Sequence, residues 1–296
     1  MSIITKIKNR SKWLISYPRH WFFKTFYPTP KVKGIEETLQ KIIKDRPSVS
    51  RYGDGELDIM VGKNIPFQKY EPLLAEKMKN ILQTNEEDFL VCLANVFSDF
   101  SYLTEKSQKY FKNHMRTTRH LWYGLIDLKK DYFCAQITRP YIDFEDKSNA
   151  PIYFNSLKRV WQDRDIVIIE GEKSRLGIGN DLFDSAKSIK RILCPAKNAF
   201  SFYDDILNAV AKLDKDCMIL LALGPTATAL AYDIYKMGYQ AVDIGHVDIE
   251  YEWFLMGATT KVPIKNKYTN EAIGGTEVAD SQDSLYLSQI IAKIGC

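Results

Sequence analysis

The feature that most constrains the fold is an alternation of apolar and amphipathic segments in the second half of the chain. Residues 165–171 (DIVIIEG) and part of 191–200 (RILCPAKNAF) predict buried strands, and residues 203–213 (YDDILNAVAKL) predict a helix. Residues 217–246 predict a strand, a turn, a helix that stops at a glycine, and another strand. Strands that alternate with helices indicate an α/β fold with a mostly parallel sheet and helical crossovers, which binds ligands at the carboxyl ends of its strands.

The first half of the chain continues this pattern with less regular spacing. Residues 35–45 and 73–83 have helical periodicity, and a short strand is expected just before the sequence RYGDGE, which begins at Arg51. Residues 88–96 (DFLVCLANV) predict an apolar strand, whereas residues 97–150 are aromatic and charged and are expected to be mostly helical. We therefore expect one domain over residues 35–296.

Residues 1–34 have a different composition and predict a separate, basic and aromatic N-terminal arm. They contain eight Lys or Arg, seven aromatic residues and no acid, and Pro28, Pro30 and Gly34 mark a linker. Cations beside aromatic rings suit the headgroup region of an anionic membrane, so a peripheral membrane contact is one interpretation. The alternative is an arm that packs its rings on its own domain or on a partner subunit.

Charge and cysteine content exclude some classes of protein. The whole chain carries +4 and residues 1–34 carry +8, so the remainder is acidic and a nucleic-acid-binding surface is not expected. The five cysteines show no CxxC spacing, which indicates reduced thiols. The N-terminus lacks the apolar core of a signal peptide. We expect a cytoplasmic protein, with the inner face of the plasma membrane as a candidate location.

Two acids one residue apart, Asp54 and Glu56, lie in a glycine-rich turn after the first predicted strand. A divalent cation prefers carboxylate oxygens, and a diphosphate can complete its ligand set. On an extended backbone, both side chains would point to the same side, and Gly55 would leave room for the ion. The alternative is a solvated turn without a ligand.

A second glycine-rich stretch, residues 170–183 (EGEKSRLGIGNDLF), directly follows a predicted strand. Lys173 and Arg175 offer positive charge to phosphates, and Gly177 lets backbone N–H groups approach an anion. The stretch lacks the third glycine of the dinucleotide-binding fingerprint. The alternative is a structural loop followed by a helix capped at Asn180 or Asp181.

A helix that begins in the stretch LGPTATALAYDIY (residues 223–235) is a third candidate. Pro225 suits a first helical turn and Thr226 can cap it, so the helix amino end after Gly224 is a candidate anion site. A cap without a ligand explains this stretch equally well.

The fourth candidate is the stretch DIGHVDIEYEWF (residues 243–254), where one histidine lies among several acids after a strand. The residues singled out are Asp243, His246, Asp248 and Glu250. Such a group could bind a metal, donate to a leaving phosphate or act as a base. A structural histidine is the alternative.

Together these motifs resemble the GT-D-fold glycosyltransferase family over roughly residues 36–271. The stretches that carry the resemblance are RYGDGE, GEKSRLGIGNDLF, GPTATALAYDIYKMGYQAVDIGHVDIEYEW and KYTNE, in this order. The family implies a Rossmann-like sheet of its own topology, a D-x-E motif that binds Mn²⁺ or Mg²⁺, and a UDP-sugar donor. It also implies a role in bacterial surface polysaccharide or glycoprotein glycan assembly, with a glycan acceptor that could be lipid-linked. By motif match, Asp54 and Glu56 would be the metal ligands.

The resulting hypothesis is a metal-dependent transferase that moves a hexose from UDP-glucose or UDP-galactose. The catalytic candidates are Asp243, His246, Asp248 and Glu250, and the candidates for binding the donor are Arg51, Lys173, Arg175, Gly177, Asn180, Gly224 and Thr226. Two alternatives stay open: a non-catalytic, membrane-associated subunit of a polysaccharide assembly complex, and another nucleotide-dependent transferase such as a methyltransferase.

Overall fold

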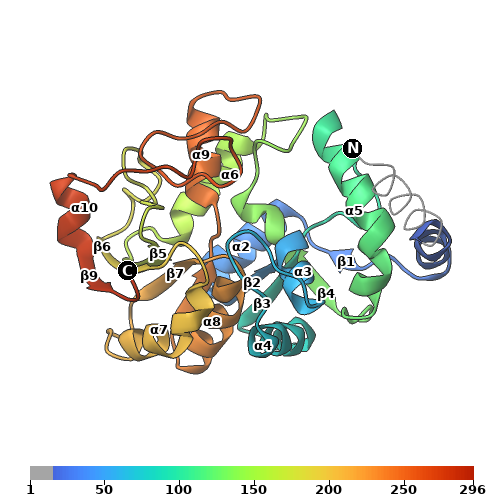
Figure 1. Ribbon diagram of the computed structural model, residues 1–296, viewed down its shortest axis with the longest axis horizontal. Coiled ribbons are helices and arrows are strands. Elements are labelled where there is room, and N and C mark those ends of the chain that lie inside the picture. Colours follow the sequence, from blue (N-terminus) through green and yellow to red (C-terminus); the bar gives the residue numbers. More distant parts are fainter. Residues whose placement is uncertain (1–15) are drawn as a thin grey trace, which may run out of the picture.

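The protein is described by a computed structural model over residues 16–296, in which a parallel sheet is covered by helices on both faces (Figure 1). Within that range the sheet has nine strands in the order β1-β4-β3-β2-β8-β7-β5-β6-β9, and each neighbouring pair is parallel. The strands are β1 (Lys31–Val32), β2 (Ser48–Tyr52), β3 (Phe89–Leu93), β4 (Asp131–Cys134), β5 (Asp165–Gly171), β6 (Ser188–Cys194), β7 (Met218–Ala222), β8 (Gln240–Asp243) and β9 (Ile290–Lys293).

Helices connect most successive strands, whereas the crossover from β5 to β6 runs through residues 172–187 without a helix. They are α2 (Ile35–Asp45), α3 (Asp54–Met60), α4 (Pro72–Gln83), α5 (Glu105–Tyr123), α6 (Ala150–Val160), α7 (Tyr203–Val210), α8 (Pro225–Lys236), α9 (Val247–Leu255) and α10 (Ser284–Gln289). Residues 16–26 form a further helical segment that precedes β1. No helix in residues 16–296 is long and apolar enough to cross a bilayer.

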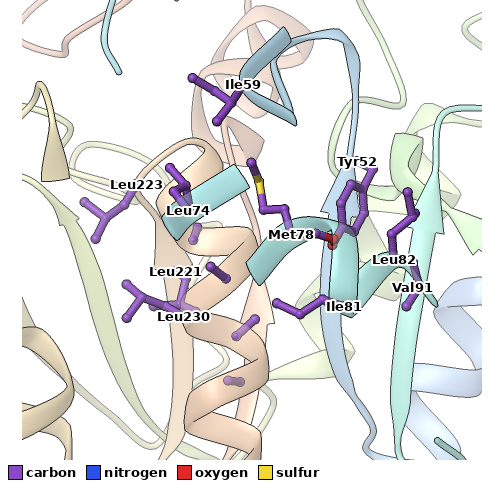
Figure 2. Packing of buried hydrophobic residues seen from close by; sticks show 14 of the residues in the cluster. Tyr52, Ile59, Leu74, Met78, Ile81, Leu82, Val91, Leu221, Leu223 and Leu230 are labelled. Carbon is purple, nitrogen blue, oxygen red and sulfur yellow. The ribbon is translucent and has the colours of Figure 1, made fainter. Parts of the chain in front are cut away.

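The core consists of two apolar layers, one on each face of the sheet. Alternate residues of a strand point to opposite faces, so β5 places Val167 in one layer and Ile168 in the other. The first layer includes side chains of α4, α7 and α8, and the second includes side chains of α2, α6 and α9. Figure 2 shows Met78 of α4 beside the ring of Tyr52 from β2, whose hydroxyl donates to the Met78 carbonyl at 2.8 Å.

The strand order reverses its direction at the centre of the sheet. From β2 the chain adds β3 and β4 on one side, whereas β8, β7, β5 and β6 lie on the other. The loops after β2 and β8 therefore diverge and leave a crevice at the carboxyl ends of the strands, which is where open α/β sheets bind ligands.

Two local expectations were wrong. Residues 97–150 were expected to be mostly helical, but α5 spans only Glu105–Tyr123 and β4, which pairs with β3, lies after it. Asp54 and Glu56 were expected on an extended turn, but they lie in the first turn of α3. The boundary expected at residue 34 stays a prediction, although β1 already joins the sheet edge beside β4.

Candidate functional site

A cavity of about 810 Å³ opens at the crevice between the carboxyl ends of the central strands. Its lining includes residues that follow β2, β3, β4, β7 and β8, together with one side of α5 and the segment 259–271. A cavity of this size is within the range that holds a small-molecule ligand or cofactor. Of the residues expected to act, it is lined by Arg51, Asp54, Glu56, Gly224, Asp243, His246 and Asp248.

Asp54 and Glu56 reach the cavity from the amino end of α3. Gly53 is the N-cap residue, and its backbone N–H donates to Glu56 Oε2 at 2.8 Å. Neither Gly53 nor Gly55 adopts a left-handed backbone, and Gly53 is extended with a φ of −128°. The amino end of a helix also stabilises negative charge, so it favours the charged forms of both acids beside the cavity.

Glu56 and Asp243 form a pair of acids that repel each other inside the cavity. Burial, followed by the charge of Asp243, raises the pKa of Glu56 to about 7. Burial likewise raises the pKa of Asp243, although Arg51 partly opposes the shift. Arg51 Nη1 lies 3.5 Å from Asp243 Oδ1. Gly245 makes this approach feasible, because a Cβ there would lie 2.3 Å from Arg51 Nη1 and its φ is +47°.

Helix α5 forms a second wall beside Asp54. The hydroxyl of Tyr110 donates a hydrogen bond to Asp54 Oδ2, and its ring stacks on His114 with centroids 6.1 Å apart. Burial lowers the pKa of His114, although the charges of Asp54 and Asp58 oppose the shift. The wall therefore presents aromatic surfaces and a neutral imidazole to a ligand held near the acids.

A third wall combines two cations and a histidine around Glu271. Arg139 donates to both Glu271 oxygens at 2.8 Å, and Lys261 Nζ lies 2.6 Å from Glu271 Oε2. These neighbours keep the pKa of the Glu271 carboxyl well below its usual range, despite its burial. Burial lowers the pKa of His246 to about 4, so its ring is neutral at pH 7. Arg139, Lys261, Glu271 and His246 all line the cavity.

Asp248 and Glu250 are already engaged by the protein. Asp248 accepts hydrogen bonds from the Gly177 backbone N–H and the Asn180 side chain, both at 2.8 Å, and from Lys267. Glu250 Oε1 accepts the backbone N–H groups of residues 141 and 142 at 2.9 and 2.7 Å, and its side chain does not line the cavity. The geometry therefore supports a structural role for both acids, fixing the loops around the cavity.

The predicted phosphate-binding loop after β5 also makes contacts of its own. Arg175 is buried and donates to the backbone carbonyls of residues 266 and 279. Lys173 and Thr226 are outside the cavity lining, and Thr226 donates to Gln68 at 3.3 Å. Gly224, at the start of α8, does line the cavity. Positive charge in the cavity comes instead from Arg51, Lys106, Arg139 and Lys261.

The donor atoms fit a divalent cation in part. Among residues 16–296, no group of three or more His, Cys, Asp or Glu side chains is arranged to hold a metal ion by itself. However, Asp54, Glu56 and Asp243 face one cavity, where burial and then the charge of Asp243 raise the pKa of Glu56. Carboxylate oxygens are the donors that Mg²⁺ and Mn²⁺ prefer, with oxygens of a bound phosphate to complete the set.

Sequence reasoning missed Arg139, Glu271, Lys261, Tyr110 and His114. Glu271 ends the quoted motif KYTNE, yet no role was assigned to it. Arg139 follows β4, the strand that went unrecognised, so its position at a carboxyl end could not be inferred. Tyr110 and His114 are four residues apart on one helix face, a spacing that also suits a packing surface.

Two curated relatives are similar to most of the chain. "Glycosyltransferase GlyD" of Streptococcus pneumoniae is 44% identical over 267 residues, which is 89% of this chain and 32% of that protein. "Probable glycosyl transferase Gly" of Streptococcus gordonii is 40% identical over 272 residues, which is 89% of this chain and 39% of that protein. The chain thus spans 32% and 39% of the lengths of these two relatives.

Solved structures and a family description agree with this likeness. The structure reported as "The highly conserved domain of unknown function 1792 has a distinct glycosyltransferase fold" is 43% identical with a TM-score of 0.86, covering 96% of this chain and 100% of that one. "A New Glycosyltransferase (DUF1792) from Streptococcus sanguinis" is 39% identical with a TM-score of 0.86, covering 90% of this chain and 100% of that one. Residues 49–272 match the family "Glycosyltransferase GT-D fold". The resemblance seen in the sequence motifs is confirmed, and the chain belongs to the family of glycosyltransferases with the GT-D fold.

Proposed function

We propose that the chain transfers a hexose from a UDP-sugar, UDP-glucose or UDP-galactose, to a glycan acceptor and uses Mn²⁺ or Mg²⁺. The observation that carries this proposal is the group of three carboxylates, Asp54, Glu56 and Asp243, at one end of the cavity. Such a concentration of negative charge would repel a diphosphate unless a cation lies between them. Assembly of a bacterial surface polysaccharide or glycoprotein glycan is the proposed setting, and a lipid-linked acceptor is one candidate.

Asp54 and Glu56 would hold the cation, with Asp243 nearby. When bound, the cation offsets the negative charge that develops on the departing diphosphate. The chain's own part is to keep both acids at the amino end of α3, through the bond from the Gly53 backbone N–H to Glu56. Tyr110 orients Asp54 from the other side.

Arg51, Arg139 and Lys261 are proposed as the cations that face the donor phosphates. Glu271 fixes Arg139 through two parallel hydrogen bonds and also holds Lys261, so both cations are pre-positioned. His246 lies among them and is neutral at pH 7, so one ring nitrogen can donate a hydrogen bond to a phosphate oxygen. The roles predicted for Lys173, Arg175, Gly177, Asn180 and Thr226 would then be indirect, through the shape of the loops.

Asp243 is the proposed proton acceptor if the transfer inverts the sugar configuration. Its raised pKa makes it a better base than an ordinary carboxylate, and Arg51 stabilises its charged form. Asp248 and Glu250 are less suitable as bases, because Asp248 Oδ1 and Glu250 Oε1 already accept hydrogen bonds from backbone N–H groups of the surrounding loops.

The test is release of UDP from a panel of nucleotide sugars, with Mn²⁺, with Mg²⁺ and with EDTA. We expect turnover of a UDP-hexose that EDTA abolishes and that Asp54→Asn lowers by about 10²-fold, a loss typical of removing charge stabilisation in a transition state. Asp205, an exposed acid in the first turn of α7 that lies outside the cavity lining, provides the matched control as Asp205→Asn. Turnover that persists in EDTA would refute the metal, and turnover of another nucleotide sugar would refute the donor.

Family membership argues against the two alternatives. A methyltransferase would not depend on Asp54 and Glu56, and a non-catalytic subunit would release no UDP from any donor. The same panel therefore separates all three hypotheses, because each gives a different pattern of donor and metal dependence.

A further inference from the structure

The helical segment at residues 16–26 is fastened to α5 by one of its faces. His20 Nδ1 lies 3.0 Å from the carbonyl oxygen of Met115, and the ring of Phe23 packs against Tyr123 with centroids 5.6 Å apart. Tyr27, just after the segment, contacts Tyr123 edge-on at 5.7 Å. Figure 1 shows the segment as a dark blue helix beside α5. The segment is therefore held in one orientation relative to the domain.

The rings that do not face α5 form an exposed aromatic face, defined here as Trp21, Phe22 and Phe26. Their exposed fractions are 55%, 47% and 62%. Phe26 joins the three, because its ring lies 5.7 Å from Trp21 and 5.3 Å from Phe22. Single exposed apolar residues need no explanation, but three adjacent aromatic rings on one short segment indicate a contact surface.

The sequence that contains this face is strongly basic. Arg19 and Lys24 lie on the same segment, and Lys6, Lys8, Arg10 and Lys12 precede it in the sequence, with no acid anywhere in residues 1–34. Aromatic rings with flanking Lys and Arg are the composition of segments that lie in the headgroup region of a bilayer. A second copy of the chain is a poorer partner, because its own arm would bring eight like charges to the same contact.

We propose that the exposed aromatic face docks on an anionic lipid surface. The rings would insert at the headgroup level, while Arg19 and Lys24 bind lipid phosphates. This inference is independent of the proposed donor and metal, since it concerns a surface outside the cavity lining.

Docking would place the cavity close to the lipid surface, because α5 both contacts the docking segment and lines the cavity. Met115 and Tyr123 of α5 hold the segment, while Tyr110 and His114 of the same helix line the cavity. A lipid-linked acceptor would then meet the cavity without leaving the membrane, although lipid binding itself does not require such an acceptor.

The experiment is co-sedimentation of the full chain with vesicles of phosphatidylcholine alone and with 30% phosphatidylglycerol, at about 50 and 500 mM NaCl. We expect binding to the anionic vesicles only, weakened by salt, because each basic residue near such a surface adds about fivefold to affinity. At 500 mM NaCl, the triple variant W21S/F22S/F26S should bind the anionic vesicles at least about tenfold more weakly than the wild type. The matched control L285S/L287S changes two leucines on α10, exposed by 64% and 46%, and should bind like the wild type.

Tryptophan fluorescence tests insertion directly. Trp122, Trp161 and Trp253 are buried, so in a Trp13→Phe background the exposed reporter is Trp21. Brominated anionic lipid should quench it and shift its emission to the blue. Absence of wild-type binding, or equal binding by the triple variant, would overturn the proposal. A wild-type dimer that the triple variant disrupts, without vesicle binding, would assign the face to self-association instead.

Discussion

Replacing Glu56 with Gln should stabilise the metal-free protein at alkaline pH while abolishing its metal response. Gln keeps the shape of the side chain and an oxygen that can accept the Gly53 backbone N–H, so the start of α3 is preserved. What the substitution removes is a charge that the folded protein, without a cation, holds at a cost beside Asp243.

The magnitude follows from the pKa of Glu56, raised from an ordinary 4.5 to about 7 in the folded state. Below pH 4.5 the carboxyl is protonated in both states and contributes nothing to the pH dependence. Between pH 4.5 and 7 the unfolded chain ionises first, so wild-type stability falls as pH rises, and above pH 7 the loss is complete. The full shift corresponds to about 3 kcal/mol, which is an upper bound because the side chain is partly exposed and water screens its charge.

The assay is urea unfolding of wild type and Glu56→Gln in EDTA at about pH 4.5 and pH 8. We expect the variant to be more stable by up to about 3 kcal/mol at pH 8 and by about 0.5 kcal/mol or less at pH 4.5. The matched control is Glu76→Gln on an exposed position of α4, which should change stability by no more than about 0.5 kcal/mol at either pH.

Adding Mn²⁺ should reverse the order of the two proteins. Wild type gains stability because the cation binds only the folded state, whereas Glu56→Gln gains little and loses about 10²-fold or more of its turnover. A variant that is no more stable than wild type at pH 8 in EDTA would refute the electrostatic reasoning. An equal Mn²⁺ response in both proteins would refute Glu56 as a ligand.

Three further outcomes are expected. Below pH 7, Mn²⁺ affinity measured by titration calorimetry should fall about tenfold per pH unit, because a proton competes for Glu56; a pH-independent affinity would contradict this. Lys261→Ala should weaken UDP binding about tenfold but leave uridine binding unchanged, since a phosphate contact is worth about 1.5 kcal/mol or more. Arg175→Ala should change the affinity for both ligands equally. The reverse pattern would assign the phosphate contact to Arg175. Lys267→Met should cost about 3–5 kcal/mol in urea unfolding, because it leaves Asp248 buried without its cation, and a loss below about 1 kcal/mol would show that the ion pair is dispensable.

Much of the sheet could be predicted from the sequence because β3, β5 and β7 are apolar runs bounded by turn residues. The strand at 165–171, the helix at 35–45 and the strand–helix–strand unit after residue 217 all appear in the structure. β4 was missed because its four residues, DYFC, follow two lysines and alternate in burial, so no apolar run marks it.

The site could be predicted only where its residues follow strands that were recognised. Asp54 and Glu56 follow β2, Asp243 ends β8 and His246 follows it, and all four line the cavity. The paired hydrogen bonds from Arg139 to Glu271 join residues that are 132 positions apart in the chain, and a local sequence pattern cannot predict such a contact. The pattern of acids after residue 246 also could not show that Asp248 forms an ion pair with Lys267, since that lysine lies in a later loop.

The two outermost strands of the sheet bear on how its edges are protected from pairing with other chains. β1 and β9 are short, with two and four residues, and they flank longer strands whose free edges could recruit another chain. Both lie outside the residues that match the family, 49–272. The segments on either side of this matched range therefore cover the edges of β4 and β6, and loss of β1 and β9 would expose the backbone of these two strands to intermolecular pairing.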